Sequence, residues 1–295
     1  MKTVSCLLLL CCLTLGGCSR FFFFPEAGIS QTPADLGYRF DSRLLATGDG
    51  SLINVWRIDS ATRPSLGAIL FFHGNSLNMG HHFAQVRWLV DAGYDVMMMD
   101  YRGFGLSQGS PNLRDSLADI RQVTALFLAE FPAEQPRFFL AQSLGATMAG
   151  RVIAMEPGLR AGFNGVILDS AFTGFNDQAR FMVGGGQGWS WIWDFPAALL
   201  TPMGHDLDDV IERIAPTPLL ILHSVNDRLI AFHNAEKLYR KAGQPKKLLV
   251  FDNHDHLQTL FQPDARRELA LFMDSQLSPA QLAMRQAASD TKVQR

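Results

Sequence analysis

A serine at the end of a short apolar run is the first candidate for chemistry in this sequence. Ser143 follows the apolar segment 138–141 and precedes a helix-like run over residues 146–155. A strand, a sharp turn and a helix form the context in which a G-x-S-x-G turn exposes a nucleophilic serine. The turn is strained, so the residues two positions away must be small; these are Ala141, in place of the first glycine, and Gly145. A buried serine at a strand end is the alternative interpretation.

A serine hydroxyl is a weak nucleophile until a base takes its proton, so a histidine and an acid must lie near it. Two histidines, His254 and His256, follow the last predicted strand. Asp169 and Asp227 each follow an earlier predicted strand. An aspartate at position 227 is also compatible with a helix N-cap, so the residues alone leave both the base and the acid open.

The elements that would position these residues alternate along the chain from about residue 67 to residue 275. Continuous apolar runs predict strands buried on both faces over residues 67–72, 94–101, 138–141, 165–168, 218–222 and 247–251. Helical patterns separate them over residues 83–92, 112–131, 146–155, 233–242 and 257–277. A hairpin over residues 38–45 and 52–58 comes first. The alternation predicts an α/β fold with a mostly parallel sheet, helices on both faces and a ligand crevice at the carboxyl ends of the strands.

An insertion between residues 171 and 215 interrupts this alternation, because it contains no strand pattern. It carries a run of glycines and three closely spaced tryptophans, Trp189, Trp191 and Trp193. We interpret the insertion as a short cap whose tryptophans form an apolar wall for an acyl or aromatic group of the substrate. Ordinary packing of a helical excursion on the sheet, or contact with membrane lipid, are the alternatives.

Residues 38–275 resemble the α/β-hydrolase superfamily, and more narrowly its single-domain serine hydrolases of the esterase or serine-aminopeptidase type. The resemblance rests on an H-G-N loop at 73–75, a D-Y-R-G-x-G-x-S loop at 100–107, the serine turn at 141–145 and an aspartate loop at 223–227, all in the family's order. The family's order of serine, aspartate and histidine implies Ser143 as nucleophile, Asp227 as the acid that orients the imidazole, and His256 as base.

The same resemblance implies two backbone N–H donors for an oxyanion hole, those of Asn75 and Leu144. His256 aligns better with the family histidine than His254, which stays the alternative base. The chain departs from the family where Ser224 replaces a glycine and where no glycine precedes the histidine. His73 is expected to shape the loop rather than to react.

The N-terminus is predicted to lie outside the folded domain. An apolar stretch over residues 4–15 is too short to span a bilayer and has the length of a signal sequence. It ends in Leu-Gly-Gly-Cys at Cys18, which resembles a bacterial lipobox with cleavage before Cys18 and lipid on its thiol. An ordinary secretory signal is the alternative. We expect a signal peptide over 1–17, a lipidated tether over 18–36, the hydrolase domain over 37–277 and a polar tail over 278–295.

This N-terminus predicts a lipid-anchored protein of the bacterial cell envelope, and Ser19 after the cysteine resembles sorting to the outer membrane, facing the periplasm. All four cysteines lie in or at the end of the signal, so the mature chain has no disulfide framework. The formal net charge is −2 without a basic patch, which argues against nucleic acid as a partner. Neither metal-ligand spacing nor a glycine-rich phosphate loop is present, so we expect no metal and no cofactor.

Three functional hypotheses follow. The leading one is a serine hydrolase that cleaves a carboxylic ester or thioester through an acyl-enzyme on Ser143. A peptidase or aminopeptidase of the same fold is the second, because acidic residues of the insertion could hold a substrate amine: Asp194, Asp206, Asp208 and Asp209. The third is an envelope lipoprotein that uses the fold as a binding scaffold without catalysis.

Overall fold

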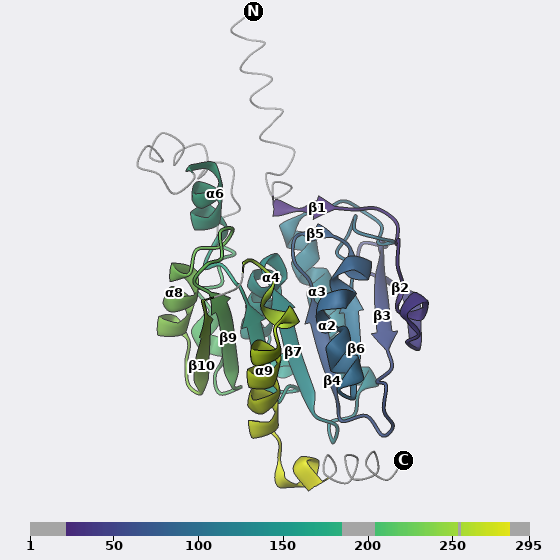
Figure 1. Ribbon diagram of the computed structural model, residues 1–295. Helices are drawn as coiled ribbons and strands as arrows, with labels where there is room; N and C mark the ends of the chain where they lie inside the picture. The colour runs from purple at the N-terminus through teal and green to yellow at the C-terminus, as the bar shows by residue number, and fades with distance from the viewer. Residues whose placement is uncertain (1–21, 185–203, 253–254, 284–295) are drawn as a thin grey trace, which may run out of the picture.

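The computed structural model describes residues 22–184, 204–252 and 255–283. An eight-stranded sheet in the order β10-β9-β8-β7-β4-β6-β3-β2 forms its centre (Figure 1). The strands are β2 (Phe40–Ala46), β3 (Leu52–Ile58), β4 (Gly67–Phe72), β6 (Tyr94–Met99), β7 (Arg137–Gln142), β8 (Gly165–Asp169), β9 (Leu219–Ser224) and β10 (Lys246–Phe251). Neighbours from β10 to β6 run parallel, whereas β3 pairs antiparallel with both β6 and β2.

Each central strand is buried on both faces, which explains its continuous apolar sequence. Successive side chains of a strand point to opposite faces of the sheet. In β7, Phe139 and Ala141 therefore join the core on one face, while Phe138 and Leu140 join the core on the other.

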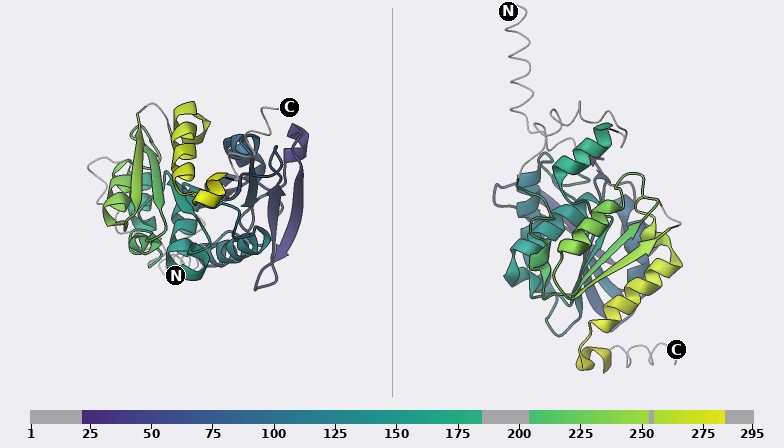
Figure 2. Two further views of the ribbon diagram at one scale, coloured as in Figure 1. Left: turned by 90° about the horizontal axis from the view of Figure 1, so that it is seen from below. Right: turned by 90° about the vertical axis from the view of Figure 1, so that its left-hand side faces the viewer.

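Helices cover both faces of the sheet (Figure 2). One face carries α3 (Leu113–Glu130), α4 (Leu144–Met155) and α8 (His233–Lys241), and the other carries α2 (Met79–Asp91) and α9 (Pro263–Ser275). Shorter helical segments are η2 (Pro33–Leu36), α5 (Pro157–Arg160), α6 (Phe175–Gly184), η3 (Ile211–Ile214) and η4 (Thr259–Phe261). The predicted mostly parallel α/β fold is thus confirmed.

Helix α2 begins at Met79, four residues before the predicted start, because two side chains satisfy its first N–H groups. The Asn78 side chain accepts a hydrogen bond from the Gly80 N–H at 3.0 Å. The Asp100 carboxylate accepts one from the Met79 N–H at 2.7 Å. Such capping lets a helix start before its apolar stripe does.

The prediction of a tether over residues 18–36 is wrong for residues 22–36, which pack on the domain. Phe22 and Phe23 are buried in the core, and β1 (Phe24–Pro25) pairs in parallel with β5 (Ser76–Leu77) as a separate two-stranded sheet. We call residues 22–27 the N-terminal strap. Cys18 and the predicted signal peptide lie outside the described residues.

The predicted polar tail from residue 278 also needs correction, because its first part is folded against the domain. Gln281 is buried. Its side-chain carbonyl accepts a hydrogen bond from Asn164 Nδ2 at 3.2 Å, and its Nε2 donates to the Glu134 carbonyl at 3.3 Å. These contacts extend the domain to at least residue 281.

The insertion over residues 171–215 is described at its two ends. Its first part contains α6, whereas its last part packs into the core through Leu207, Ile211 and Ile214, with η3 against α4. Residues 204–215 therefore belong to the body of the domain rather than to a cap. The three tryptophans of the predicted wall lie outside the described residues. In the described part of the chain, no helix has the length and apolar character that crossing a membrane requires.

Candidate active site

Ser143 occupies the sharp turn between β7 and α4. Its backbone angles are φ 54° and ψ −122°, a conformation that non-glycine residues seldom adopt. The Ser143 N–H donates to the Asp169 carbonyl at 2.9 Å, and the Ser143 carbonyl accepts from the Thr147 N–H at 3.1 Å. Neighbouring β8 and the first turn of α4 thus hold the serine in a strained position, as expected at functional sites.

The small residues around the serine are not equally important. A Cβ at Gly145 would lie 2.3 Å from the His73 carbonyl oxygen and 2.6 Å from the Tyr101 hydroxyl. Position 145 therefore requires glycine. Ala141 is fully buried in the core, which shows that the turn accommodates a methyl group at this position.

The structure brings Ser143, His256 and Asp227 together from three strand ends. The imidazole Nε2 of His256 lies 3.0 Å from Ser143 Oγ, and its Nδ1 lies 2.7 Å from Asp227 Oδ2. The hydrogen bond to Asp227 fixes the neutral tautomer with the proton on Nδ1, which leaves Nε2 free to accept the serine proton. The imidazole is partly exposed, whereas the aspartate side chain is fully buried.

Asp227 is held by its own loop as well as by the histidine. Its Oδ1 accepts hydrogen bonds from the N–H groups of Leu229 at 2.9 Å and Ile230 at 2.8 Å. Burial acts to raise the pKa of this carboxyl, but the hydrogen bond and charge of His256 and the Ile230 N–H outweigh it, so the pKa is lowered. The aspartate is therefore ionised at neutral pH, as the orienting partner of an imidazole must be.

The other candidate acids have different partners. Asp169 is fully buried and accepts a hydrogen bond from Gln142 Nε2 at 2.8 Å. Burial raises its pKa to about 6 despite that hydrogen bond and the nearby His256. Asp255 pairs with Arg228, at 3.0 Å from its Nε. The alternative base, His254, lies outside the described residues.

The two predicted oxyanion donors flank the serine. Leu144 is the first residue of α4, where a helix N–H has no partner within the helix. Residues 73–75, here named the oxyanion loop, border the serine, since a Cβ on Gly74 would lie 3.6 Å from Ser143 Cβ. Among the described residues, no hydrogen-bond acceptor is found for the N–H of Asn75 or of Leu144. Both donors are thus available to a ligand.

Buried side chains brace this loop from behind, in agreement with the expected role of His73. The His73 Nδ1 donates to the Gly74 carbonyl at 2.8 Å, and the Tyr101 hydroxyl donates to the His73 carbonyl at 2.8 Å. The His73 Nε2 lies 3.4 Å from Asp100 Oδ1, and its ring stacks on His82 at 4.7 Å. The sequence reasoning missed Asp100 and His82, although Asp100 opens the D-Y-R-G-x-G-x-S loop.

Arg102 ties the D-Y-R-G-x-G-x-S loop, residues 100–107, to helix α3. Its guanidinium donates two hydrogen bonds of 2.8 Å to the Asp119 carboxylate and one of 2.8 Å to Asp49. Both Arg102 and Asp119 are buried. A bidentate pair of this kind fixes position as well as charge, so the loop behind the oxyanion loop is anchored to the helix layer.

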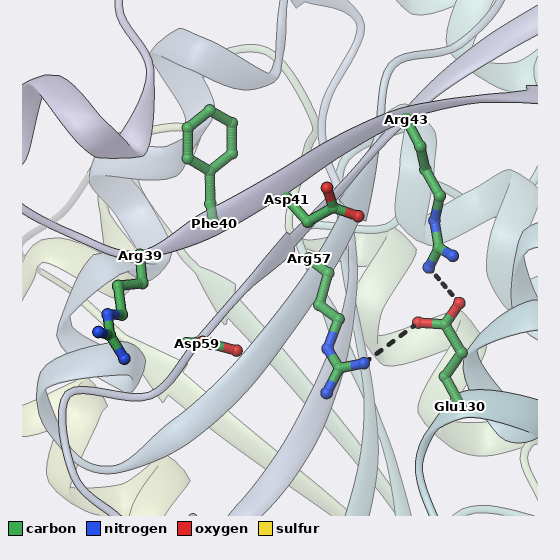
Figure 3. A pocket seen from close by; sticks show the side chains of 7 residues that line it. All are labelled: Arg39, Phe40, Asp41, Arg43, Arg57, Asp59 and Glu130. Atoms are coloured by element: carbon green, nitrogen blue, oxygen red, sulfur yellow. Dashed lines mark hydrogen bonds and ion pairs between the residues drawn. The ribbon is translucent and has the colours of Figure 1, made fainter.

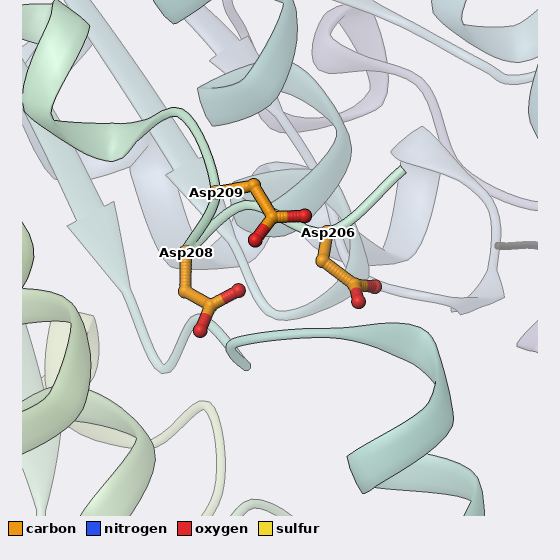
Figure 4. Close-up of side chains that lie close together, drawn as sticks. All are labelled: Asp206, Asp208 and Asp209. Carbon is orange, nitrogen blue, oxygen red and sulfur yellow. The ribbon is translucent and has the colours of Figure 1, made fainter. Parts of the chain in front are cut away.

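Three carboxylates of the insertion, Asp206, Asp208 and Asp209, lie within 4.8 Å of one another (Figure 4). Two of them already have partners within the protein. Asp206 Oδ1 accepts from the Phe175 N–H at 2.9 Å, and Asp208 pairs with Lys237 and Lys241 at 3.0 and 2.8 Å. The cluster therefore ties the last part of the insertion to α6 and α8.

A second region of interest is a pocket of about 350 Å³ on the edge formed by β2 and β3 (Figure 3). Three arginines and three acids line it together with one phenylalanine: Arg39, Arg43, Arg57, Asp41, Asp59, Glu130 and Phe40. Three strands separate β2 from β7 in the sheet order. The pocket is therefore distinct from the serine site.

Comparison with known proteins agrees with this architecture. Residues 63–193 match the family described as serine aminopeptidase, S33 (Hydrolase_4). The Pyrococcus furiosus esterase Pf2001 superposes with a TM-score of 0.68 at 20% identity, covering 85% of this chain and 97% of the esterase. The chain has the α/β-hydrolase fold. Acetyl xylan esterase 1 from Thermoanaerobacterium sp. JW/SL YS485 shares the fold, with a TM-score of 0.59 at 19% identity. The superposition covers 82% of this chain and 89% of the esterase.

Two sequence relatives differ in how much of their length they share with this chain. The uncharacterized protein YfhR of Escherichia coli K12 is 29% identical over 267 residues, and the match covers 88% of each chain. The lysophosphatidylserine lipase ABHD12 of Danio rerio is 29% identical over 205 residues, which is 64% of this chain but 51% of the lipase.

Proposed function

We propose that this protein is a serine hydrolase that cleaves a carboxylic ester or thioester through an acyl-enzyme on Ser143. The observation that carries the proposal is the hydrogen-bonded chain from Ser143 Oγ through His256 to Asp227. His256 takes the serine proton as Ser143 attacks the carbonyl carbon, and Asp227 stabilises the imidazolium. The N–H groups of Leu144 and Asn75 receive the developing oxyanion.

The remaining steps of the reaction use the same groups. His256 gives its proton to the departing alcohol or thiol, and the acyl group stays on Ser143. A water molecule then gives a proton to His256 and attacks the acyl carbon. His256 returns that proton to Ser143 Oγ as the bond from the acyl carbon to Oγ breaks, which releases the acid and restores the serine. Acylation and deacylation both need a base and an oxyanion hole. In this proposal His256 is the base, and the N–H groups of Leu144 and Asn75 form the oxyanion hole.

Two considerations support an ester over a peptide as substrate. An aminopeptidase needs an acidic group to hold the substrate amine, and of the four acids named for this role two are engaged, Asp206 by a backbone N–H and Asp208 by two lysines. The esterases and the lipase among similar proteins point to esters as well. A peptidase remains the second candidate because of the S33 family match.

A scaffold without catalysis is disfavoured by the site itself. A binding protein has no need for a strained serine with φ 54° within 3.0 Å of an imidazole that is in turn bound to a buried aspartate. Strain of this kind persists where function requires it.

The test uses a fluorophosphonate probe and short p-nitrophenyl esters. The wild-type protein should be labelled and should hydrolyse the esters faster than the matched aminoacyl p-nitroanilides, whereas Ser143→Ala should lose both labelling and turnover. Ser110→Ala, on the surface loop before α3, serves as the control and should retain both. Labelling of the Ser143→Ala protein would remove this serine from the role.

We further propose that Cys18 carries lipid and anchors the protein in the bacterial cell envelope. We place the anchor in the outer membrane, with the protein facing the periplasm. The proposal is supported by the apolar stretch before Leu-Gly-Gly-Cys. A lipid-anchored chain should be found in the membrane fraction, and Cys18→Ala should move it to the soluble fraction. Retention of the variant in the membrane fraction would refute lipid attachment at this residue.

A further inference from the structure

We propose that the N-terminal strap, residues 22–27, is a positioning element of the active site that holds the oxyanion loop in its working geometry. The inference rests on the proposed function, because the oxyanion loop matters only if Ser143 forms a tetrahedral intermediate. It adds a role for a segment that would otherwise be a connection between a lipid anchor and the domain.

The strap binds the oxyanion loop directly through Phe24, whose N–H donates to the Asn75 carbonyl at 2.8 Å. The Glu26 N–H donates at 3.0 Å to the carbonyl of Leu77, which lies in β5, outside the oxyanion loop. These bonds make β1 and β5 a parallel pair next to the residue whose N–H is the proposed oxyanion donor.

The two peptide groups that flank the Asn75 Cα are therefore both fixed through their carbonyls. The peptide before it is held by His73 Nδ1, which donates to the Gly74 carbonyl at 2.8 Å. The peptide after it is held by the strap through Phe24. Because a trans peptide is planar, with C=O and N–H on opposite sides, fixing the Gly74 carbonyl sets the direction of the Asn75 N–H. The strap removes the remaining rotation of this residue from the other side.

Aromatic side chains keep the strap in place. The Phe22 ring packs against Phe172 at 6.2 Å and against Phe175 at 5.1 Å, and the Phe23 ring packs against Phe104 at 6.3 Å. Phe22 and Phe23 are 3% and 5% exposed, as in a domain core rather than in a linker.

Through Phe172, the contacts of Phe22 also connect the strap to helix α4, which begins directly after Ser143. The Phe172 N–H donates to Thr147 Oγ1 at 3.1 Å, and Thr147 lies one turn after Ser143 in α4. β1 and β5 lie at the same end of the molecule as α6 (Figure 1). The strap thus spans from the oxyanion loop to the start of the insertion, across the edge where Ser143 is found.

The experiment compares two proline substitutions in the full-length protein. Phe24→Pro removes the N–H that binds Asn75, and Glu26→Pro, the matched control, removes the N–H that binds Leu77. Active sites are counted by complete fluorophosphonate labelling, so that kcat is expressed per labelled site. We expect Phe24→Pro to lower kcat by roughly 10-fold or more with a KM close to that of wild type, because a displaced oxyanion donor acts on the transition state. Glu26→Pro should keep kcat within a factor of about three, since the other donors stay in place.

A role in folding alone would give a different result. It would lower the melting temperature and the number of labelled sites in both variants, with an unchanged kcat per site. Equal kcat per site in Phe24→Pro, Glu26→Pro and wild type would therefore overturn the positioning role and leave the proposed hydrolase function intact. A wild-type protein that is not labelled at Ser143 would instead refute the function on which the inference rests.

A second variant keeps the test decisive if Phe24→Pro does not fold. Phe22→Ala combined with Phe23→Ala releases the strap without altering any hydrogen-bond donor. The proposal expects the same selective loss of kcat per labelled site, together with weaker inhibition by a trifluoromethyl ketone, whose hemiketal oxygen occupies the oxyanion hole. Unchanged kcat and unchanged inhibition in this variant would overturn the proposal.

Discussion

His256 Nε2 lies 3.0 Å from Ser143 Oγ although 113 residues separate the two in the sequence. The two residues follow different strands, and the parallel sheet places both strand ends at one edge. This distance favours His256 over His254 as the base, a choice that the sequence left open.

The two histidines can be separated by mutation. His256→Ala should lower kcat by roughly 10²–10⁴-fold, the usual contribution of a general base. His254→Ala should stay close to wild type in ester turnover. Hydrolysis of p-nitrophenyl acetate by both purified variants measures the difference, and a larger loss in His254→Ala would reverse the assignment.

Substitution of the two buried aspartates, Asp227 and Asp169, should also affect kcat to different extents. Asp227→Asn removes the carboxylate that fixes the tautomer of His256, so we expect kcat to fall by up to about 10⁴-fold. Asp169→Asn can still accept the hydrogen bond from Gln142 and should lose less than roughly 10-fold in kcat. Comparable losses in the two variants would show that Asp169 acts in the reaction.

Asp169 should also make stability depend on pH. Its pKa is raised from 3.8 to about 6 by burial. The folded state therefore binds the proton more tightly than the unfolded state, so this stabilisation is complete below about pH 4 and is lost as the pH rises through 6. A shift of this size corresponds to at most about 3 kcal/mol.

Thermal melting of wild type and Asp169→Asn from pH 4 to pH 7 measures this effect. The variant does not ionise at position 169, so its melting temperature should rise relative to that of wild type as the pH increases. The comparison cancels the contributions of other groups, including His82, whose pKa is lowered by burial to about 3. A constant difference between the two proteins would contradict ionisation of Asp169 in this range.

Gly145→Ala should disrupt the serine turn. The added methyl group would lie 2.3 Å from the His73 carbonyl oxygen, which is backbone and cannot rotate away. We expect a loss of about 3 kcal/mol in unfolding free energy, at the upper end of overpacking costs, together with loss of ester turnover. Gly158→Ala, in a helical turn with no atom within 4 Å of the new methyl, should be neutral or slightly stabilising. Urea unfolding of both variants measures the contrast.

The fold and the order of the site residues could be predicted because both depend on local patterns. Buried parallel strands read as continuous apolar runs, and their carboxyl ends are marked by residues such as Ser143 and Asp227. The early start of α2 could not be read from its apolar stripe, because the Asp100 side chain that accepts from the Met79 N–H comes from another strand end.

The N-terminal strap could not be assigned either. Four consecutive phenylalanines before a proline are compatible with membrane contact or with packing, and local sequence does not say which. Whether these rings pack on the domain depends on the side chains that they meet there. Phe23 contacts Phe104, and Phe22 contacts Phe172 and Phe175, residues that only the folded chain brings close. The distance of 3.0 Å from His256 Nε2 to Ser143 Oγ likewise depends on the folded sheet, and no spacing along the chain contains it.

If Cys18 carries a lipid as proposed, the strap leaves only a short connection between that lipid and the edge of the sheet where Ser143 lies. Phe22 is already fixed in the core, and it follows Cys18 by four residues. Four residues reach at most about 14 Å even when fully extended. A hydrolase tied so closely would sample molecules in or beside its own bilayer at a high effective concentration, while esters far from that surface would meet it rarely. The length of this connection would then restrict which substrates the enzyme encounters, independently of what its pocket can bind.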